Sequence, residues 1–245
     1  MNRIVVLAAM LLCLISCGGS GGGSNSADGS SVDRSKVSEI TETLNQPGSD
    51  DSLDGSWLYV GESSETSSQD VDSGMYSGVW FESYNIIDNG DTVDITGCNG
   101  YVGPKLYLES GGNVTLSWGA EEYEGVNRNN ALLEFDTKEF DVVEDGVQYF
   151  VQSTFSLVKL SNIISDSIGI LKVDDATIEI SCIWYANMSE IDSNGDRQPW
   201  YQAVFKSVEG EYFYFLTEDI FTMNFSGKVI SITFEDGGEG SFSFY

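Results

Sequence analysis

The stretch Lys228-Val229-Ile230-Ser231-Ile232-Thr233-Phe234-Glu235 places three large apolar residues at every second position. Successive side chains of a β-strand point to opposite faces, so this spacing predicts a strand with Ile230, Ile232 and Phe234 on one buried face. The segment from Thr177 to Trp184 has the same alternation. Two strands of this kind need further strands to cover their apolar faces, and the surrounding sequence supplies them.

From Gly55 onward, β-branched and aromatic residues are interrupted by Gly, Asn and Asp. Turns are predicted where Gly and Asn tolerate a positive φ, at Asn89-Gly90, Asp145-Gly146, Asn194-Gly195 and Glu209-Gly210. We predict a single all-β domain over residues 55–245, an antiparallel meander closed as a barrel or folded as a two-sheet sandwich. Its further strands are predicted at Trp57–Glu62, Gly78–Ile87, Thr92–Thr96, Asn113–Trp118, Val147–Val151, Thr154–Leu160, Tyr201–Lys206, Glu211–Leu216 and Ser241–Tyr245.

The amino terminus has the layout of an export signal. Arg3 precedes an apolar run from Ile4 to Ile15, which is shorter than the about 20 residues that a membrane-spanning helix needs. The run ends in Leu14-Ile15-Ser16-Cys17, which resembles the lipobox of bacterial lipoproteins. The resemblance implies a signal peptide over residues 1–16 and acyl chains such as palmitate on Cys17. Gly18 in place of an aspartate implies an anchor in the outer membrane. The resemblance does not distinguish the periplasmic face of that membrane from its outer face.

Residues 17–54 are rich in Gly, Ser, Asp and Asn and predict a lipid-anchored flexible linker. Within it, Val37, Ile40 and Leu44 fall at helical spacing, which indicates a short helix over residues 36–44. Such a helix docks on the domain, binds a partner or forms only a transient turn. Its length favours the transient turn, because a helix of under three turns is marginal alone.

The β domain opens with Leu53-Asp54-Gly55-Ser56-Trp57, in which Gly55 and Trp57 resemble the Gly-x-Trp at the first strand of lipocalin-like barrels. The resemblance implies a calycin-like barrel. A Thr-Asp-Tyr segment and an arginine after the last strand, which that family also carries, are absent from this sequence.

Cleavage before Cys17 and acylation of that residue leave two cysteines, Cys98 and Cys182. In an oxidising compartment they predict a disulfide bond. Two separate buried thiols are the alternative.

The chain has a net charge of −28 and no histidine. This charge argues against nucleic acid as a partner. Asp192, Asn194 and Asp196 resemble the start of an EF-hand or dockerin calcium loop, but Arg197 and Ala203 stand where the complete loop needs Gly and a bidentate Glu. We expect no cofactor, and calcium at this loop is the alternative to a plain polar turn.

The absence of histidine excludes Ser-His-Asp and Cys-His catalysis. Glu190-Ile191-Asp192 resembles the first half of the Glu-x-Asp-x-Glu strand of β-glucan-cleaving sandwiches, and Asn194 replaces the second glutamate. We therefore expect no catalytic residues and no enzyme, with a paired-carboxylate glycoside hydrolase as the lesser alternative.

Binding is favoured by the aromatic residues. Tyr212-Phe213-Tyr214-Phe215 places rings on both faces of one strand, and the candidates for ligand stacking are Trp184, Tyr185, Trp200 and Tyr201. The alternative is that these rings build the core. We predict a lipid-anchored envelope protein whose β domain binds an apolar small molecule or a glycan. The alternative is a structural or assembly lipoprotein that binds another envelope protein. A filled core without a pocket would favour this alternative.

Overall fold

The protein is an all-β chain, as predicted. The computed structural model describes residues 40, 44, 52–67, 78–89, 93–97, 102–118, 121–144, 147–191, 197–216, 220–226 and 228–245. The strands in these residues are β1 (Gly55–Ser67), β2 (Gly78–Asp88), β3 (Val93–Gly97), β4 (Val102–Leu108), β5 (Asn113–Trp118), β6 (Glu121–Arg128), β7 (Leu132–Phe135), β8 (Lys138–Glu144), β9 (Val147–Ser161), β10 (Gly169–Val173), β11 (Ala176–Ile191), β12 (Arg197–Ser207), β13 (Tyr212–Leu216), β14 (Ile220–Ser226), β15 (Val229–Phe234) and β16 (Glu239–Phe244).

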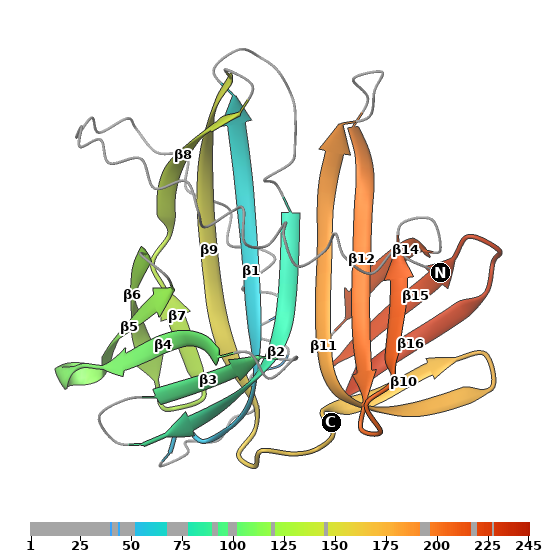
Figure 1. Ribbon diagram of the computed structural model, residues 1–245, viewed down its shortest axis with the longest axis horizontal. Coiled ribbons are helices and arrows are strands. Elements are labelled where there is room, and N and C mark those ends of the chain that lie inside the picture. The colour runs from blue at the N-terminus through green and yellow to red at the C-terminus, as the bar shows by residue number, and fades with distance from the viewer. Residues whose placement is uncertain are drawn as a thin grey trace.

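Eight strands close into an antiparallel barrel (Figure 1). The first seven pair in chain order, and β9 pairs with both β7 and β1. Gly55–Ser63 of β1 pairs with Ile86–Gly78 of β2, and the ring closes where β9 pairs with β1. The predicted meander closed as a barrel is therefore confirmed. Strand β8 lies beside the ring and forms a hairpin with the first half of β9.

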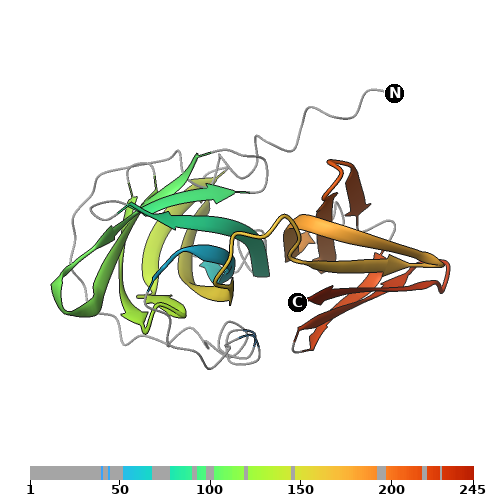
Figure 2. The same ribbon diagram turned by 90° about the horizontal axis from the view of Figure 1, so that it is seen from below.

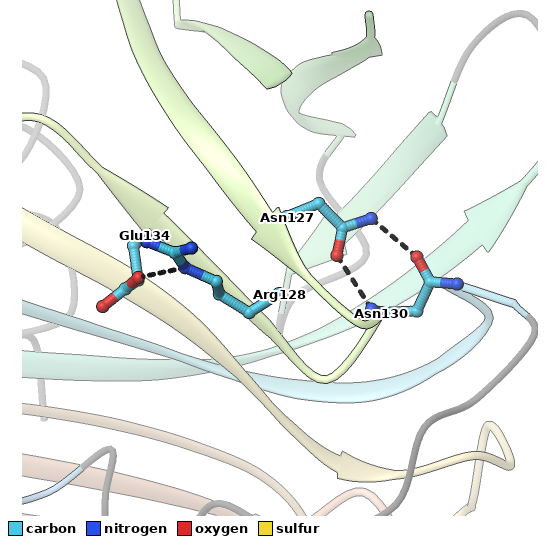
Figure 3. Close-up of polar contacts among 4 residues, drawn as sticks. All are labelled: Asn127, Arg128, Asn130 and Glu134. Atoms are coloured by element: carbon cyan, nitrogen blue, oxygen red, sulfur yellow. Dashed lines mark hydrogen bonds and ion pairs between the residues drawn. The ribbon is translucent and has the colours of Figure 1, made fainter. Parts of the chain in front are cut away.

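The hairpin between β6 and β7 shows how a tight turn keeps the strands of the ring in order (Figure 3). Asn129 and Asn130 have φ angles of 56° and 55°, which asparagine tolerates better than most residues. The Asn127 side chain accepts a hydrogen bond from the Asn130 backbone N–H at 2.8 Å and donates one to the Asn130 side chain at 2.6 Å. Arg128 and Glu134 form an ion pair at 2.8 Å across the same hairpin.

Among the described residues, buried side chains pack the interior of the barrel. A Cβ at Gly61 would lie 2.4 Å from the indole of Trp80, and one at Gly125 would lie 2.8 Å from the Phe135 ring. The missing side chains at these two glycines therefore make room for the two rings. The first core of the protein consists of Leu53, Trp57, Tyr59, Tyr84, Ile86, Val93, Ile95, Leu106, Val114, Leu116, Leu133, Phe135, Phe155 and Leu157.

Trp57 lies at one end of this core and is fully buried. Its indole N–H donates a hydrogen bond to the Leu53 carbonyl at 2.9 Å. Lys159, near the end of β9, places its Nζ atom 5.6 Å from the centroid of the Trp57 ring. The lipocalin resemblance implies an arginine after the last strand, and the sequence has none. Lys159, on the last strand of the barrel, places a cation beside Trp57 instead.

Strands β10 to β16 extend the sheet beyond the barrel (Figure 2). Trp184–Met188 of β11 pairs with Glu82–Gly78 of β2, and β12 and β13 continue from β11. The first half of β11 pairs with β10, from which β16, β15 and β14 follow. The two halves of β11 meet at Ser181, where the register with β12 shifts and the Ser181 hydroxyl donates to the Lys206 and Ser207 carbonyls at 3.1 and 3.0 Å.

A second core joins the outer wall of the barrel to these later strands. Leu58, Val60 and Phe81 belong to barrel strands, whereas Phe205 and Phe242 belong to β12 and β16. The Phe205 and Phe242 ring centroids are 5.3 Å apart. The buried members of the second core are Ile40, Leu44, Leu58, Val60, Phe81, Val158, Ile168, Leu171, Ile180, Ile183, Tyr185, Ala203, Phe205, Ile230, Ile232, Phe242 and Phe244.

Ile40 and Leu44 come from the predicted linker, and both have helical backbone conformation. Their side chains are only 5% and 0% exposed, and both pack in the second core. The sequence favours a transient turn here, and for these two residues that prediction is wrong: Ile40 and Leu44 are buried in the core of their own domain. Val37 lies outside the described residues. No helix within the described residues is long and apolar enough to cross a membrane.

Candidate ligand-binding surface

The filled barrel directs the search for a binding site to the outer surface. A groove of about 370 Å³ lies on β10, β15 and β16, and a hollow of about 80 Å³ lies near Ser56 and Tyr245. Neither is lined by residues of the first core. The groove is mostly polar, and its lining comprises Lys172, Asp174, Ser231, Ile232, Thr233, Glu239, Gly240 and Ser241.

Strand β13 carries aromatic rings on both faces, as its sequence predicts. Phe213 and Phe215 pack against the second core. Tyr212 and Tyr214 point the other way and are 40% and 59% exposed. Their ring centroids are 6.1 Å apart and their planes differ by 21°. One strand therefore fixes two nearly parallel tyrosine rings at the surface while its phenylalanines hold it to the core.

Lys206 on β12 supports this pair of rings. It lies directly opposite Tyr212 in the register of β12 and β13. Its Nζ atom is 5.4 Å from the centroid of the Tyr212 ring, within the range of a cation–π contact. The ammonium group is thus held beside the ring, where it can also donate hydrogen bonds to a bound molecule.

The same face of the sheet continues across two more strands. Tyr214 is opposite Val204 on β12, and Val204 is opposite Trp184 on β11. Neighbouring strands lie about 4.8 Å apart, so the backbones at Trp184 and Tyr214 are about 10 Å apart. We call Trp184, Val204, Lys206, Tyr212 and Tyr214 the tyrosine surface.

The other predicted stacking residues are distributed differently. Tyr185 is 6% exposed, and its ring stacks on Phe81 at a centroid distance of 4.5 Å. The prediction that Tyr185 stacks on a ligand is therefore wrong. Ile180 faces the second core, and the register shift at Ser181 then places Ile183 and Tyr185 on the core side, so that Trp184 faces the other way. Trp200 and Tyr201 lie on β12, but their side chains are outside what the structure describes, so they stay predictions.

Several predicted sites lie outside the described residues, namely Cys17, Cys98 and the loop with Asp192, Asn194 and Asp196. Cys182 is described, and it lies buried on β11. Within the described ranges, no group of three or more His, Cys, Asp or Glu residues could hold a metal ion.

Glu82 is a buried ionisable group of the barrel, and Tyr123 is a half-buried one. Glu82 is 5% exposed and accepts a hydrogen bond from the Tyr84 hydroxyl at 2.8 Å. Burial raises the pKa of Tyr123 above its ordinary value of 10.0, and the charge of Glu121 raises it further. Lys138 contacts Glu121 and Tyr123. Its ammonium group pairs with the Glu121 carboxylate, and its Nζ atom lies 4.8 Å from the centroid of the Tyr123 ring. These groups belong to the filled barrel, and neither described hollow reaches them.

No protein-family model, curated protein or solved structure matches this chain. The fold defines the class: an all-β protein built on a closed eight-stranded antiparallel barrel with a sheet extension. Its function therefore has to be inferred from the chemistry of its own surface.

Proposed function

We propose that this protein is a lipid-anchored envelope protein whose β domain binds a glycan on the tyrosine surface, outside the barrel. The observation that carries the proposal is the pair of nearly parallel, exposed rings of Tyr212 and Tyr214. A tyrosine ring offers an apolar face together with a polar tip. A sugar presents C–H faces and hydroxyl groups, which match these two features.

The tyrosine surface is held in place before any ligand arrives. Phe213 and Phe215 anchor β13 in the core, and Lys206 contacts the Tyr212 ring. Little side-chain freedom is then lost on binding, which favours affinity.

The filled barrel supports a glycan over an apolar small molecule. An apolar ligand needs an enclosed pocket lined by apolar side chains. In the described part of the barrel, the rings of Trp80 and Phe135 occupy the space that the glycines leave. An exposed aromatic surface suits a ligand that stays partly in water, as a glycan does.

The test is calorimetric titration of the chain from Cys17 onward with soluble dextran, laminarin, xylan and chitin oligosaccharides. Loss of stacking on two rings, at about 0.5–1.5 kcal/mol each, should weaken binding about tenfold in the Tyr212→Ala/Tyr214→Ala double variant. Tyr107→Ala is the matched control, because Tyr107 is 38% exposed on β4. Equal affinity in the double variant, or no binding of any of these glycans, would contradict the proposal.

A second candidate is a structural lipoprotein that binds another envelope protein, and the filled barrel favours it. A photo-crosslinking residue placed at Tyr214 in growing cells distinguishes the two. A discrete protein adduct, absent when the same residue is placed at Tyr107, supports the structural function. Crosslinking to carbohydrate alone supports the glycan.

We infer that the anchor is lipid on Cys17 in the outer membrane. The support is the apolar run and the lipobox-like Leu14-Ile15-Ser16-Cys17. Mass spectrometry of the amino-terminal peptide should find acyl chains on Cys17, and Cys17→Ser should release the protein from membranes. An unmodified Cys17 would contradict the anchor and leave the glycan proposal standing.

We also infer a disulfide bond between Cys98 and Cys182. Cys182 is buried on β11, and an oxidising compartment favours pairing of the two cysteines that remain after cleavage before Cys17 and acylation of that residue. Strands β3 and β11 pair with successive parts of β2, since Gly97 lies opposite Tyr84 and Trp184 lies opposite Glu82. In the sequence, Cys98 directly follows Gly97, and Cys182 lies two residues before Trp184.

A further inference from the structure

The link between β9 and β10 presents two large apolar side chains to solvent. Ile163 is 71% exposed and Ile164 is 44% exposed. They are adjacent, β-branched and uncharged in a chain with a net charge of −28. Figure 2 shows this link running between the barrel and the later strands.

Serine hydroxyls hold the link in place. Ser56 on β1 donates a hydrogen bond to the Ile163 carbonyl at 3.3 Å and accepts one from the Ser165 N–H at 3.4 Å. Ser161 accepts a hydrogen bond from the Ile163 N–H at 3.2 Å, and the Ser167 hydroxyl donates one to the Ile180 carbonyl at 3.4 Å. The exposure of the isoleucines is therefore fixed by the fold.

Tyr245 lies beside this link, and Val208 is connected to Tyr245 through Glu179. Tyr245 is 54% exposed, and its N–H donates to the Ile168 carbonyl at 3.2 Å. The Tyr245 hydroxyl donates to the Glu179 carboxylate at 3.5 Å, and the Val208 N–H donates to the Glu179 carbonyl at 3.0 Å. Val208 is 41% exposed. We call Ile163, Ile164, Val208 and Tyr245 the linker patch, and the link and the C-terminus lie at the same end of the molecule in Figure 1.

The charges around the linker patch limit what it can contact. Asp166, Glu179 and Glu209 are exposed beside it, and Lys228 donates a hydrogen bond to the Tyr245 carbonyl at 2.7 Å. Three carboxylates against one ammonium group repel an anionic surface. A zwitterionic bilayer does not have this repulsion, and its interface accepts both aliphatic side chains and the amphipathic ring of tyrosine.

We propose that the linker patch contacts the zwitterionic surface of the membrane to which the chain is anchored. This inference rests on the proposed lipid on Cys17. From Cys17 to the docked Ile40 the chain has 40 − 17 = 23 steps. If this Gly- and Ser-rich stretch is the flexible linker that its sequence predicts, its average span is about 26 Å. The patch is thereby kept close to the bilayer, and a contact too weak to hold a free protein becomes persistent because the second binding event is intramolecular.

The test places a reporter in the patch. The chain from Cys17 onward is coupled through the Cys17 thiol to a maleimide lipid in phosphatidylcholine vesicles, and the variant Ile164→Trp is compared with Val143→Trp. Val143 is 70% exposed on β8, which lies at the opposite end of the molecule from the link in Figure 1. Insertion to the acyl boundary should let acyl-brominated phosphatidylcholine quench the added tryptophan about twofold. Val143→Trp should show no added quenching.

Absence of added quenching in both Ile164→Trp and Ile163→Trp would overturn the proposal and leave a protein partner as the occupant of the patch. Equal quenching of Val143→Trp would overturn it as well, because contact would then be unspecific. Using two tryptophan positions guards against one variant that fails to fold, which circular dichroism detects. The anchor in this experiment is chemical, so its outcome is independent of whether cells acylate Cys17 and of glycan binding.

Discussion

Lys159 and Trp57 form a buried cation–π pair at one end of the barrel, with the lysine Nζ atom 5.6 Å from the ring centroid. The same Nζ atom donates a hydrogen bond to the Ser52 carbonyl at 2.8 Å. Lys159 is 5% exposed and Trp57 is fully buried. The pair joins the first and last strands of the barrel to the residues that precede β1.

Replacing Lys159 with methionine should destabilise the protein by about 1–3 kcal/mol, because the Ser52 hydrogen bond and the cation–π contact are both lost while the aliphatic stem is retained. Urea unfolding measures the change. Lys105→Met on the exposed side of β4 is the control. A midpoint equal to that of the unchanged protein would show that the pair does not hold the barrel end.

Leu44→Ala should cost about 2–5 kcal/mol, because it leaves a cavity in the second core. Val143→Ala, at a position that is 70% exposed, should change stability by less than about 0.5 kcal/mol. The free energies of unfolding in urea decide this. An effect of Leu44→Ala as small as that of the control would mean that the segment before β1 does not contribute to the fold in solution.

Gly61→Ala should destabilise the barrel by about 1–3 kcal/mol through overpacking. The new Cβ would lie 2.4 Å from the Trp80 indole, which has to move. A changed near-ultraviolet circular dichroism signal should accompany the loss. Gly238→Ala is the control, since its nearest contact is the Asp236 side chain at 3.1 Å in a surface turn. Unaltered stability and dichroism in Gly61→Ala would mean that the barrel interior has spare room.

The raised pKa of Tyr123 predicts a loss of stability in alkaline solution. Burial and Glu121 raise the pKa in the folded state above 10.0, so the unfolded chain releases the Tyr123 proton first. The contribution is fully present below pH 10 and is lost as the pH rises towards the folded-state pKa. Unfolding at a series of pH values should show this decline, and Tyr123→Phe should reduce it. The same decline in Tyr123→Phe would assign it to other groups.

Mass spectrometry without reduction should find the Cys98 and Cys182 peptides joined. The bridge closes a loop of 182 − 98 = 84 positions, for which the chain-entropy model gives a stabilisation of about 4–5 kcal/mol. Reduction should lower the free energy of unfolding. Two free thiols in protein taken from the periplasmic side of the envelope would disprove the bridge.

The alternation of side chains was enough to predict many strands closely. The predicted Asn113–Trp118 coincides with β5, and Gly78–Ile87 differs from β2 by one residue. The four predicted turns each fall between strands that pair with each other. Strand β6, with the sequence Glu-Glu-Tyr-Glu-Gly-Val-Asn-Arg, was not predicted, because its inward positions include Gly125 in place of a large apolar residue. The reason for a glycine at this position becomes clear only in the structure, where the Phe135 ring lies beside it.

By itself, the sequence determined the all-β class, the strand positions with strong alternation and the two-faced character of Tyr212-Phe213-Tyr214-Phe215, because each of these depends on neighbours along the chain. Tertiary structure alone decided the closure of β9 on β1, the filling of the barrel and the docking of Ile40 and Leu44. It also turned Tyr185 into the core and left Trp184 on the tyrosine surface. These outcomes depend on contacts between residues that are far apart in the sequence. The period of a hydrophobic pattern indicates a strand but carries no information about the strand with which it pairs.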